Sequence, residues 1–287
     1  MAPVVSIVLN SYNQAQYLDE AIQSCLKQDF NEEYEVIVVD DGSTDNSVEV
    51  AKKYPVTLYE MGTNTNSWCT VPTNYAIDRA KGPWIGVVSS DNVLDPSYLK
   101  ETMARVRTLT TTRSIEVGGK KVKTGIFAPK LGIVRVGLVL IGEVYDDYGE
   151  FKLKSLPRKT PLQLPITSTG NMRRDILCCN MIYSHSLFLK KAWEEVGKYT
   201  PFKYGDYHLW IKIILAGYTV TEVDKPLYKH RIHKQALTYN ELQSEFPKEA
   251  KEEFHRFALE WKDLIIKEKI QEGDIYDALV GGGDIKP

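Results

Sequence analysis

The sequence predicts an α/β protein with a mostly parallel central sheet flanked by helices. An apolar run over Val4–Leu9 and another over Val36–Val39 have the length and composition of buried strands. Between them, apolar residues recur at helical spacing, namely Leu18, Ala21, Ile22, Cys25 and Leu26. A strand, a helix and a second strand in this order predict two parallel strands joined by a right-handed crossover.

The alternation of strands and helices continues through the first hundred residues. Val56–Tyr59 and Trp84–Val88 are expected to be short strands. Pro72–Ala80 and Pro96–Val106 are expected to be helices, the first opened by its proline and the second capped by Asp95. These elements extend the parallel sheet that begins with the first strand.

The pattern changes after residue 110. Arg113–Ile126 has two central glycines between β-rich flanks, which predicts a hairpin, and Ile133–Ile141 predicts a further strand. Ser186–Val196 and Tyr207–Ala216 are expected to be helices, each ended by a following glycine. A last strand is expected over Thr219–Val223.

The remaining residues predict one more helix. Pro247–Ile270 is mostly charged with apolar residues on one face, so we expect an amphipathic C-terminal helix packed against the body and a disordered tail after it. The chain is thus expected to comprise three parts, residues 1–110, 111–240 and 241–287. The first two parts are halves of one domain.

Composition and charge exclude several classes of function. With 287 residues, of which 43% are apolar and 26% charged, the chain has the composition of an ordinary globular protein. A net charge of −2 does not favour nucleic acid as a partner. No apolar run approaches the roughly 20 residues of a membrane-spanning helix, and the first strand begins too early for a signal peptide. The four cysteines lack metal-site spacing and are expected to be reduced thiols in the cytoplasm.

Polar residues follow the first two predicted strands. Ser11 and Tyr12 come after the first strand, and Asp40 and Asp41 end the second. Ligands of parallel sheets bind at the carboxyl ends of the strands, so the acids are expected to accept hydrogen bonds from a nucleobase or a ribose. An Asx turn that caps the next helix is an alternative role for these acids.

Two further acids are candidates for chemistry. Asp91 ends another apolar strand, where a single carboxylate can share Mg²⁺ or Mn²⁺ with substrate phosphates. Its alternative role is that of a turn acid before the next helix. Asp206 precedes an apolar-periodic helix, so it is expected at the N-cap of that helix, or as a general base if its pKa lies near the working pH.

Basic residues cluster just after the last predicted strand. Arg231 suits bidentate phosphate binding, and His230 and His233 flank it as candidate metal ligands or hydrogen-bond donors to phosphate. The sequence has no G-x-G-x-x-G after the first strand and no P-loop motif, so neither of these nucleotide fingerprints is available.

Four segments in this order resemble a family 2 glycosyltransferase with the GT-A fold. The family transfers a sugar from a nucleotide donor to an acceptor hydroxyl. The resemblance covers roughly residues 4–235 and implies a Rossmann-like sheet with a smaller acceptor-side region. The segments are VSIVLNSYNQAQYLDEAIQSCLKQ with VIVVDDGSTDNS, AKGPWIGVVSSDNVLDPSYL, FLKKAWEEVGKYTPFKYGDYHLWIKIILAGY, and LYKHRIH.

The resemblance implies roles for residues that bind the nucleotide. Ser11 and Tyr12 would line the nucleotide pocket, and Asp40 with its neighbour Asp41 would contact the base or the ribose. Asn74 matches an asparagine of the family and is expected at the donor as well.

The resemblance also implies roles at the diphosphate and the reacting atoms. Asp91 aligns with the last acid of the family's D-x-D motif, which binds Mg²⁺ or Mn²⁺ and the diphosphate, and Ser90 beside it is expected at the donor. Arg231 and His233 resemble a loop that closes over the diphosphate, with the histidine on the metal. Asp206 takes the place of the presumed catalytic base.

The sequence departs from the family's pattern at three positions. Ser89 replaces the first acid of D-x-D. Gly205 replaces the usual glutamate before Asp206, and Thr73 replaces an arginine often found before Asn74. The Q-x-x-R-W element of processive synthases is absent, which predicts single additions.

The resemblance therefore implies sugar transfer with inversion from a nucleotide-diphosphate donor, by family habit a UDP-sugar, to a glycan or lipid-linked acceptor. Residues 1–110 would bind the nucleotide sugar and residues 111–240 the acceptor. The setting would be cell-surface polysaccharide or glycan synthesis in the cytoplasm, with peripheral contact to the inner face of the membrane left open. Two alternatives remain: a nucleotidyltransferase of similar sheet topology, and a catalytically inactive binder of sugar nucleotides or glycans.

Overall fold

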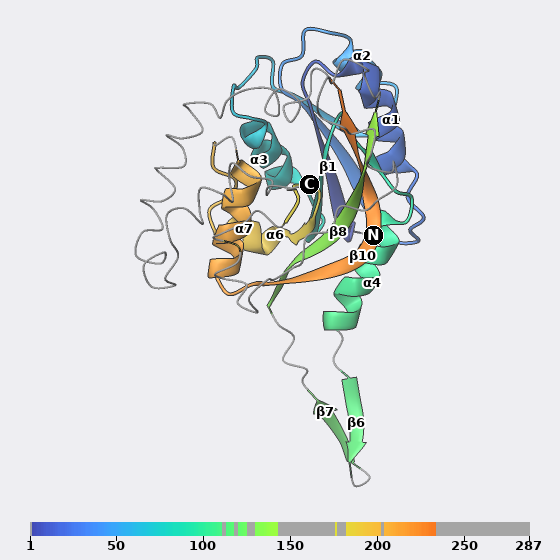
Figure 1. The fold of residues 1–287 in the computed structure, drawn as a ribbon, viewed down its shortest axis with the longest axis vertical. Helices are drawn as coiled ribbons and strands as arrows, with labels where there is room; N and C mark the ends of the chain where they lie inside the picture. Colours follow the sequence, from blue (N-terminus) through green and yellow to red (C-terminus); the bar gives the residue numbers. More distant parts are fainter. Residues whose placement is uncertain are drawn as a thin grey trace, which may run out of the picture.

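A mixed β-sheet runs through the middle of the protein with helices on both of its faces, as the computed structural model shows (Figure 1). The structure describes residues 2–110, 113–117, 120–124, 130–142, 176, 182–201 and 204–233. The strands of this sheet are β1 (Val5–Ser11), β2 (Tyr34–Asp40), β3 (Thr57–Glu60), β4 (Trp84–Ser89), β5 (Val93–Leu94), β8 (Leu131–Gly142), β9 (Leu187–Leu189) and β10 (Thr219–Ile232). Among the described residues their order is β3-β2-β1-β4-β9-β8-β10-β5.

The first half of the sheet is parallel, as the sequence predicts. β1 pairs in parallel with β2 on one side and with β4 on the other, and β2 pairs in parallel with β3. Every apolar residue of β1 is buried because helices cover both faces of the sheet, which explains why Ile7, Val8 and Leu9 follow one another without alternation.

The second half of the sheet is mixed, and it contains a strand that the sequence analysis missed. The helix expected over Ser186–Val196 is wrong in its first part, where β9 is followed by the short helix α6 (Lys190–Glu195). β9 pairs antiparallel with both β4 and β8 and so joins the two halves. Leu187 and Phe188 are completely buried there, so packing between two strands overrides the helical pattern.

Helices cover the two faces in separate groups (Figure 1). On one face lie α1 (Ala15–Leu26), α2 (Ser47–Ala51) and α4 (Tyr98–Thr110), which pack on a core that includes Leu18, Ile22 and Leu99. On the other face lie α3 (Thr70–Arg79), α6 and α7 (Gly205–Leu215), whose core includes Trp193 and Trp210. The predicted α/β architecture with a helix-flanked sheet is thus confirmed.

Helix α7 corrects the expected position of Asp206. The helix begins at Gly205 with Tyr204 at its N-cap, so Asp206 lies in the first turn and is not the N-cap. Its end agrees with the prediction, because Gly217 follows it with a φ of +86°, which favours glycine.

Strand β10 is longer than predicted. The register with β8 is irregular at Pro226, and a proline is a usual sign that a strand ends. The pairing nevertheless continues beyond it to Ile232, opposite Gly142. His230 and Arg231 therefore lie within the strand and His233 directly follows it, whereas the sequence analysis placed all three beyond the last strand.

Two other predictions can be compared with the structure. The hairpin is confirmed as β6 (Arg113–Val117) paired antiparallel with β7 (Lys120–Thr124), a separate two-stranded sheet (Figure 1). The C-terminal amphipathic helix and tail, and Cys178 and Cys179, lie outside the described residues. The described cysteines, Cys25 and Cys69, are free thiols as expected. Among the described helices, none is long and apolar enough to cross a bilayer.

Candidate active site

The carboxyl ends of β1, β2 and β4 bring most of the predicted site residues to one edge of the sheet. Ser11 pairs with Asp40 in the register of β1 and β2. The backbone N–H of Asp41 donates to the carbonyl of Ser11 at 2.8 Å, and that of Ser90 donates to the carbonyl of Asn10 at 3.1 Å. The chain therefore leaves all three strands at the same level, with their polar residues side by side.

Asp40 and Asp41 each hold a neighbouring loop. Asp40 accepts hydrogen bonds from the backbone N–H of Ser43 at 2.8 Å and from its hydroxyl at 2.5 Å, so the Asx-type turn considered from the sequence is present. Asp41 accepts from the backbone N–H of Thr65 at 3.0 Å and from its hydroxyl at 3.1 Å. Each carboxylate has further lone pairs, and the predicted contact with a base or ribose stays a prediction.

The loops after β1 and β2 are fastened to each other. The backbone N–H of Asn13 donates to the Ser43 hydroxyl at 2.9 Å, and the Asn13 side chain accepts from the N–H of Thr44 at 2.7 Å. Asp45 accepts from the N–H of Ala15 at 3.0 Å, at the start of α1. Tyr12 lies in this preformed corner and is 40% exposed, whereas the Ser11 hydroxyl is buried without a hydrogen-bond partner.

Asp91 and the end of β10 form the second part of the site. His233 Nε2 donates to Asp91 Oδ2 at 3.1 Å, and Arg231 Nε donates to the Asp91 carbonyl at 2.9 Å. The N–H of Arg231 donates to the Asn92 side chain at 2.7 Å. The structure thus brings Asp91 into contact with Arg231 and His233, which lie about 140 residues after it in the chain.

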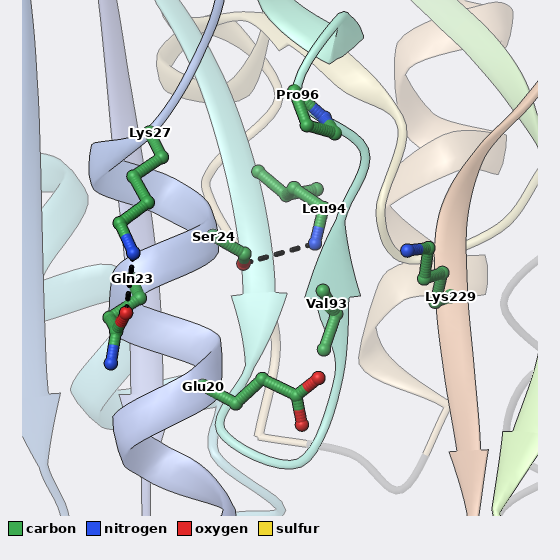
Figure 2. A pocket seen from close by; sticks show the side chains of 8 residues that line it. All are labelled: Glu20, Gln23, Ser24, Lys27, Val93, Leu94, Pro96 and Lys229. Carbon is green, nitrogen blue, oxygen red and sulfur yellow. Dashed lines mark hydrogen bonds between the residues drawn. The ribbon is translucent and has the colours of Figure 1, made fainter.

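Residues of α1 contact Arg231 and His233 at the end of β10. The Arg231 guanidinium lies 5.0 Å from the centre of the Tyr17 ring, and the His233 ring lies 4.7 Å from the same ring. Arg231 Nη2 donates to Glu20 Oε2 at 2.5 Å. Glu20 also lines a shallow pocket of about 250 Å³ between α1, β5 and β10, where its carboxylate extends from α1 toward Val93 (Figure 2).

The Asp91–His233 pair fits a divalent cation. Asp91 Oδ1 and His233 Nδ1 are both buried without a hydrogen-bond partner. Asp91 Oδ2 and His233 Nε2, 3.1 Å apart, would be the atoms that hold such a cation. Mg²⁺ usually binds through one or two carboxylates plus substrate phosphates, so a small protein contribution is in keeping with it. Among the described residues, no group of three or more His, Cys, Asp and Glu side chains could hold a metal.

The N-terminus of α3 connects this edge to the helix that carries Asp206. Burial and the negative charges of Asp41 and Asp91 raise the pKa of the Cys69 thiol to about 12, so both carboxylates lie near it. The next residue, Thr70, packs so closely on Gly205 that a Cβ there would lie 2.6 Å from its methyl carbon. The glycine before Asp206 is thus required by packing, which accounts for the absence of the family's glutamate.

Asn74 positions the segment before α7. Its side-chain amide donates to the Tyr199 carbonyl at 2.8 Å and accepts from the Tyr199 N–H at 3.0 Å. Burial and the charge of Asp206 raise the pKa of Tyr199 well above its usual range, which places Asp206 near that side chain. Asp206 Oδ1 accepts from the N–H of Tyr207 at 2.8 Å. The predicted contact of Asn74 with the donor stays a prediction, since its amide serves this backbone.

Sequence reasoning missed several residues of this region. Tyr17 and Glu20 lie on the polar side of α1, and nothing in the sequence links them to Arg231, 211 residues beyond Glu20. Asn92 was passed over beside Asp91. The loop before α3 carries a signal that was available, because Trp68 is a large aromatic residue in a polar stretch.

Solved structures with the same architecture define the fold. Staphylococcus aureus TarS residues 1–349 in complex with UDP-GlcNAc matches with a TM-score of 0.64 and 17% identity, over 96% of this chain and 70% of that chain. The mannosyltransferase PcManGT from Pyrobaculum calidifontis, in complex with GDP-Man and Mn²⁺, matches with a TM-score of 0.55 and 18% identity, over 85% and 61%. The fold is the GT-A fold of glycosyltransferases.

The N-terminal part of the sequence matches one family of glycosyltransferases. Residues 6–115 match the family model described as Glycosyl transferase family 2. Over these residues the chain is similar to this family, in agreement with the resemblance drawn from its motifs.

Curated relatives are glycosyltransferases with longer chains. The Staphylococcus aureus poly(ribitol-phosphate) β-N-acetylglucosaminyltransferase TarS is 36% identical over 103 residues, 34% of this chain and 18% of the relative. An uncharacterized glycosyltransferase of Rickettsia typhi is 27% identical over 238 residues, 83% and 66%. Chondroitin synthase of Pasteurella multocida is 31% identical over 154 residues, 48% and 15%. The chain thus spans less than two thirds of each of these relatives.

Proposed function

We propose that this protein transfers a sugar from a nucleoside diphosphate donor to an acceptor hydroxyl, with inversion and one addition per encounter. The observation that carries the proposal is the Asp91–His233 contact of 3.1 Å, with Arg231 beside it, at the edge where β1, β2 and β4 end. The positive charge of Arg231, and a divalent cation held by Asp91 and His233, would both attract the negative charge of a diphosphate at this edge.

The donor nucleotide would occupy the corner formed by the first two strand ends. Tyr12 is exposed there, and Asp40 and Asp41 keep lone pairs for a base or ribose. UDP is the favoured nucleotide because the TarS structure that shares this fold holds UDP-GlcNAc. The loops after β1 and β2 are already joined by hydrogen bonds, so less conformational entropy would be lost when the nucleotide binds.

The diphosphate would lie between Ser90, Arg231 and the Asp91–His233 pair. Arg231 offers a planar guanidinium for phosphate oxygens, and Asp91 with His233 would hold Mg²⁺ or Mn²⁺. A bound divalent cation supplies electrostatic stabilisation of the charge that develops on the departing diphosphate. The structure of PcManGT with Mn²⁺ supports the choice of metal.

Asp206 would act as the general base. The proton of the acceptor hydroxyl passes to its carboxylate while the hydroxyl oxygen bonds to the anomeric carbon and the bond to the diphosphate breaks. A typical general base contributes about 10²–10⁴ in rate. The contact of Thr70 with Gly205 supports this role, since it brings the first turn of α7 next to the donor edge.

The acceptor would be a glycan or a lipid-linked sugar, in cell-surface polysaccharide or glycan synthesis. Chondroitin synthase among the relatives supports a polysaccharide pathway. The free thiols of Cys25 and Cys69 suit a reducing compartment, which supports a reaction in the cytoplasm or at the inner face of the membrane.

A donor panel tests the proposal. We expect UDP-sugars to be hydrolysed or transferred, and UDP to raise the melting temperature more with Mn²⁺ than without it. Asp206→Asn should lose about 10²–10⁴ in kcat and retain UDP affinity. Asp91→Asn should lose the effect of Mn²⁺ on UDP binding. As a control, Asp29→Asn removes an exposed carboxylate paired with Lys100 and should leave both properties unchanged.

A catalytically inactive nucleotide-sugar binder is the second candidate, favoured by Ser89 in place of an acid. It predicts UDP binding without turnover of any donor. Absence of stabilisation by every nucleoside diphosphate, or an Asp206→Asn variant with the turnover of the parent protein, would refute the proposed transfer reaction.

A further inference from the structure

We propose that Trp68 is the platform on which the acceptor stacks, and that the acceptor's terminal unit is therefore a pyranose ring. The inference rests on the proposed function, because it names the acceptor class of the same site. Trp68 belongs to the loop between β3 and α3, two residues before the first residue of that helix.

Trp68 differs in exposure from the other tryptophans that the structure describes. It is 47% exposed, whereas Trp84 is 7% exposed and Trp193 and Trp210 are fully buried. Single aromatic residues on a surface are common, so exposure alone assigns no role. The backbone that carries this side chain is the feature that sets Trp68 apart.

The backbone around Trp68 is held in a conformation that side chains disfavour. Asn66, Trp68 and Cys69 have φ values of 49°, 52° and 62°, in the left-handed region. For a bulky residue such a φ is an outlier. Strained backbone persists only where its surroundings hold it in place, and it clusters at functional sites.

The surroundings that hold this loop begin at the donor edge. Asp41 accepts two hydrogen bonds from Thr65, whose hydroxyl lies 2.7 Å from the Ser67 hydroxyl. Ser67 Oγ accepts from the N–H of Val71 at 3.1 Å, inside the first turn of α3. A chain of hydrogen bonds thus fixes the residues on both sides of Trp68 to a carboxylate of the predicted nucleotide site.

Trp68 stands at the junction between donor edge and general base. The next residue, Cys69, lies within electrostatic range of Asp41 and Asp91. The residue after it packs against Gly205, which directly precedes the proposed base. Trp68 is thus next in the chain to residues near both the donor edge and the first turn of α7, which is the observation that favours contact of its exposed indole with the acceptor.

An indole face recognises a particular kind of acceptor. The ring of a pyranose presents a flat face of C–H groups, which packs on an aromatic surface, while its hydroxyls remain at the rim for polar contacts. An open-chain polyol phosphate has no such face. This chain would therefore differ in acceptor from its relative TarS, which is named for poly(ribitol-phosphate).

Saturation-transfer NMR in the presence of UDP tests the inference, because it detects sugar binding without turnover. The probes are methyl α- and β-pyranosides of glucose, galactose, mannose and N-acetylglucosamine, with ribitol 5-phosphate as the open-chain comparison. We expect at least one pyranoside to bind and ribitol 5-phosphate not to bind.

Three variants separate stacking from folding. Trp68→Ala should weaken the bound pyranoside roughly five- to fiftyfold, and Trp68→Phe should stay within about threefold of the parent protein because it keeps an aromatic face. Trp68→Gly removes the side chain at a φ that glycine adopts freely, so it should keep the melting temperature and still lose the sugar. Tyr12→Ala is the matched exposed aromatic and should weaken UDP, not the pyranoside.

The inference fails if no pyranoside binds, if ribitol 5-phosphate binds in preference, or if Trp68→Ala and Trp68→Gly bind the sugar as the parent does. Failure of the proposed function is a different result: UDP would neither bind nor be released from any donor, whatever the pyranosides do.

Discussion

Arg231 shows how a residue of the candidate site is held before any ligand is present. Its guanidinium donates to the Asp91 carbonyl and to Glu20, and it lies over the Tyr17 ring. The Glu20 side chain is 60% exposed, so its ion pair contributes at most about 1 kcal/mol. A diphosphate would compete with Glu20 for the same guanidinium, because both offer anionic oxygens.

Removing the charge of Glu20 should therefore strengthen binding of the nucleotide. We predict that Glu20→Gln raises the affinity for UDP about two- to fivefold at low ionic strength, because the negative charge is lost and the remaining amide oxygen is a weaker acceptor for Arg231 than the carboxylate. Isothermal titration calorimetry with UDP and Mn²⁺ measures the effect.

The matched control is Glu33→Gln, which removes an exposed carboxylate at the opposite edge of the sheet, just before β2. It should leave UDP affinity unchanged. The gain in Glu20→Gln should shrink as salt is raised to about 0.5 M, since screening weakens exposed charges. Unchanged or weaker UDP binding in Glu20→Gln would mean that Glu20 chiefly orients Arg231.

For single residues, the sequence predicts the candidate site side chains more successfully than it predicts their contacts. Asp40, Asp41 and Asp91 stand out because acids at the ends of apolar strands have no use in a core. Their partners could not be predicted, because Thr65 and His233 reach them through tertiary structure. Glu20 was missed for the same reason.

The contact between α3 and α7 ties two elements of the site together. Gly205 opens α7 against the Thr70 side chain, with the Thr200 carbonyl 3.2 Å from the position of a Cβ at residue 205. At an ordinary helix position, alanine in place of glycine stabilises by about 0.5–1 kcal/mol. Here the crowding should reverse that sign.

We predict that Gly205→Ala destabilises the protein by about 1–3 kcal/mol, because the new methyl group overpacks the contact. Thr70→Ser removes the methyl carbon that lies 2.6 Å away and keeps the hydroxyl that donates to Ser67. In the Thr70→Ser background, Gly205→Ala should therefore lower the free energy of unfolding by no more than half of the amount that it does in the parent protein. Urea denaturation of the four proteins measures this coupling, and additive losses would contradict the contact.

At the scale of elements, burial on both faces made the parallel strands predictable. Val4–Leu9, apart from the buried Ser6, and Trp84–Val88 have no polar side chains, which only a strand between two helical layers requires. β9 was missed because its three residues precede a true helix and share its apolar pattern. β10 was predicted too short because Pro226 interrupts pairing without ending the strand.

Across the whole molecule, the stability of the core includes an aromatic stack around the buried side chain of His185. His185 lies between Tyr183 and Tyr228, with ring centres 5.2 Å and 3.9 Å away, and its Nε2 has no hydrogen-bond partner. Burial, helped by the nearby His230, holds the pKa of His185 well below its usual value. A protonated ring would need an acceptor at Nε2 that the core does not offer.

The stack makes global stability depend on pH. In the unfolded chain His185 takes up a proton near pH 6.5, whereas in the folded protein it stays neutral to lower pH. The unfolded state then binds more protons, so the free energy of unfolding should fall as the pH drops below about 6.5. The slope for this one group is at most about 1.4 kcal/mol per pH unit.

His185→Phe keeps an aromatic ring in the stack and removes the titration. We predict that it flattens the fall in stability between pH 7 and pH 5, measured by urea denaturation without ligand. Part of the slope should remain, because burial also lowers the pKa of His230. An equal slope in the two proteins would exclude His185 as a source of the dependence.

The overall architecture follows from local patterns, whereas the assembly of the site depends on contacts far apart in the sequence. Strand, helix and strand over the first hundred residues suffice to predict a parallel sheet with a ligand edge. The junction of Thr70 with Gly205 arises only when α3 meets α7, and the loop at Trp68 is held by hydrogen bonds that start at Asp41, so no pattern in the sequence contains either of them.

The place of β9 has a consequence for the newly made chain. While the ribosome has released only about the first 180 residues, β4 has no neighbour on the side that β9 will occupy. An unpaired strand edge is a template for aggregation. That edge of β4 therefore stays available for pairing with another chain until Leu187–Leu189 have been synthesised and can pair with it.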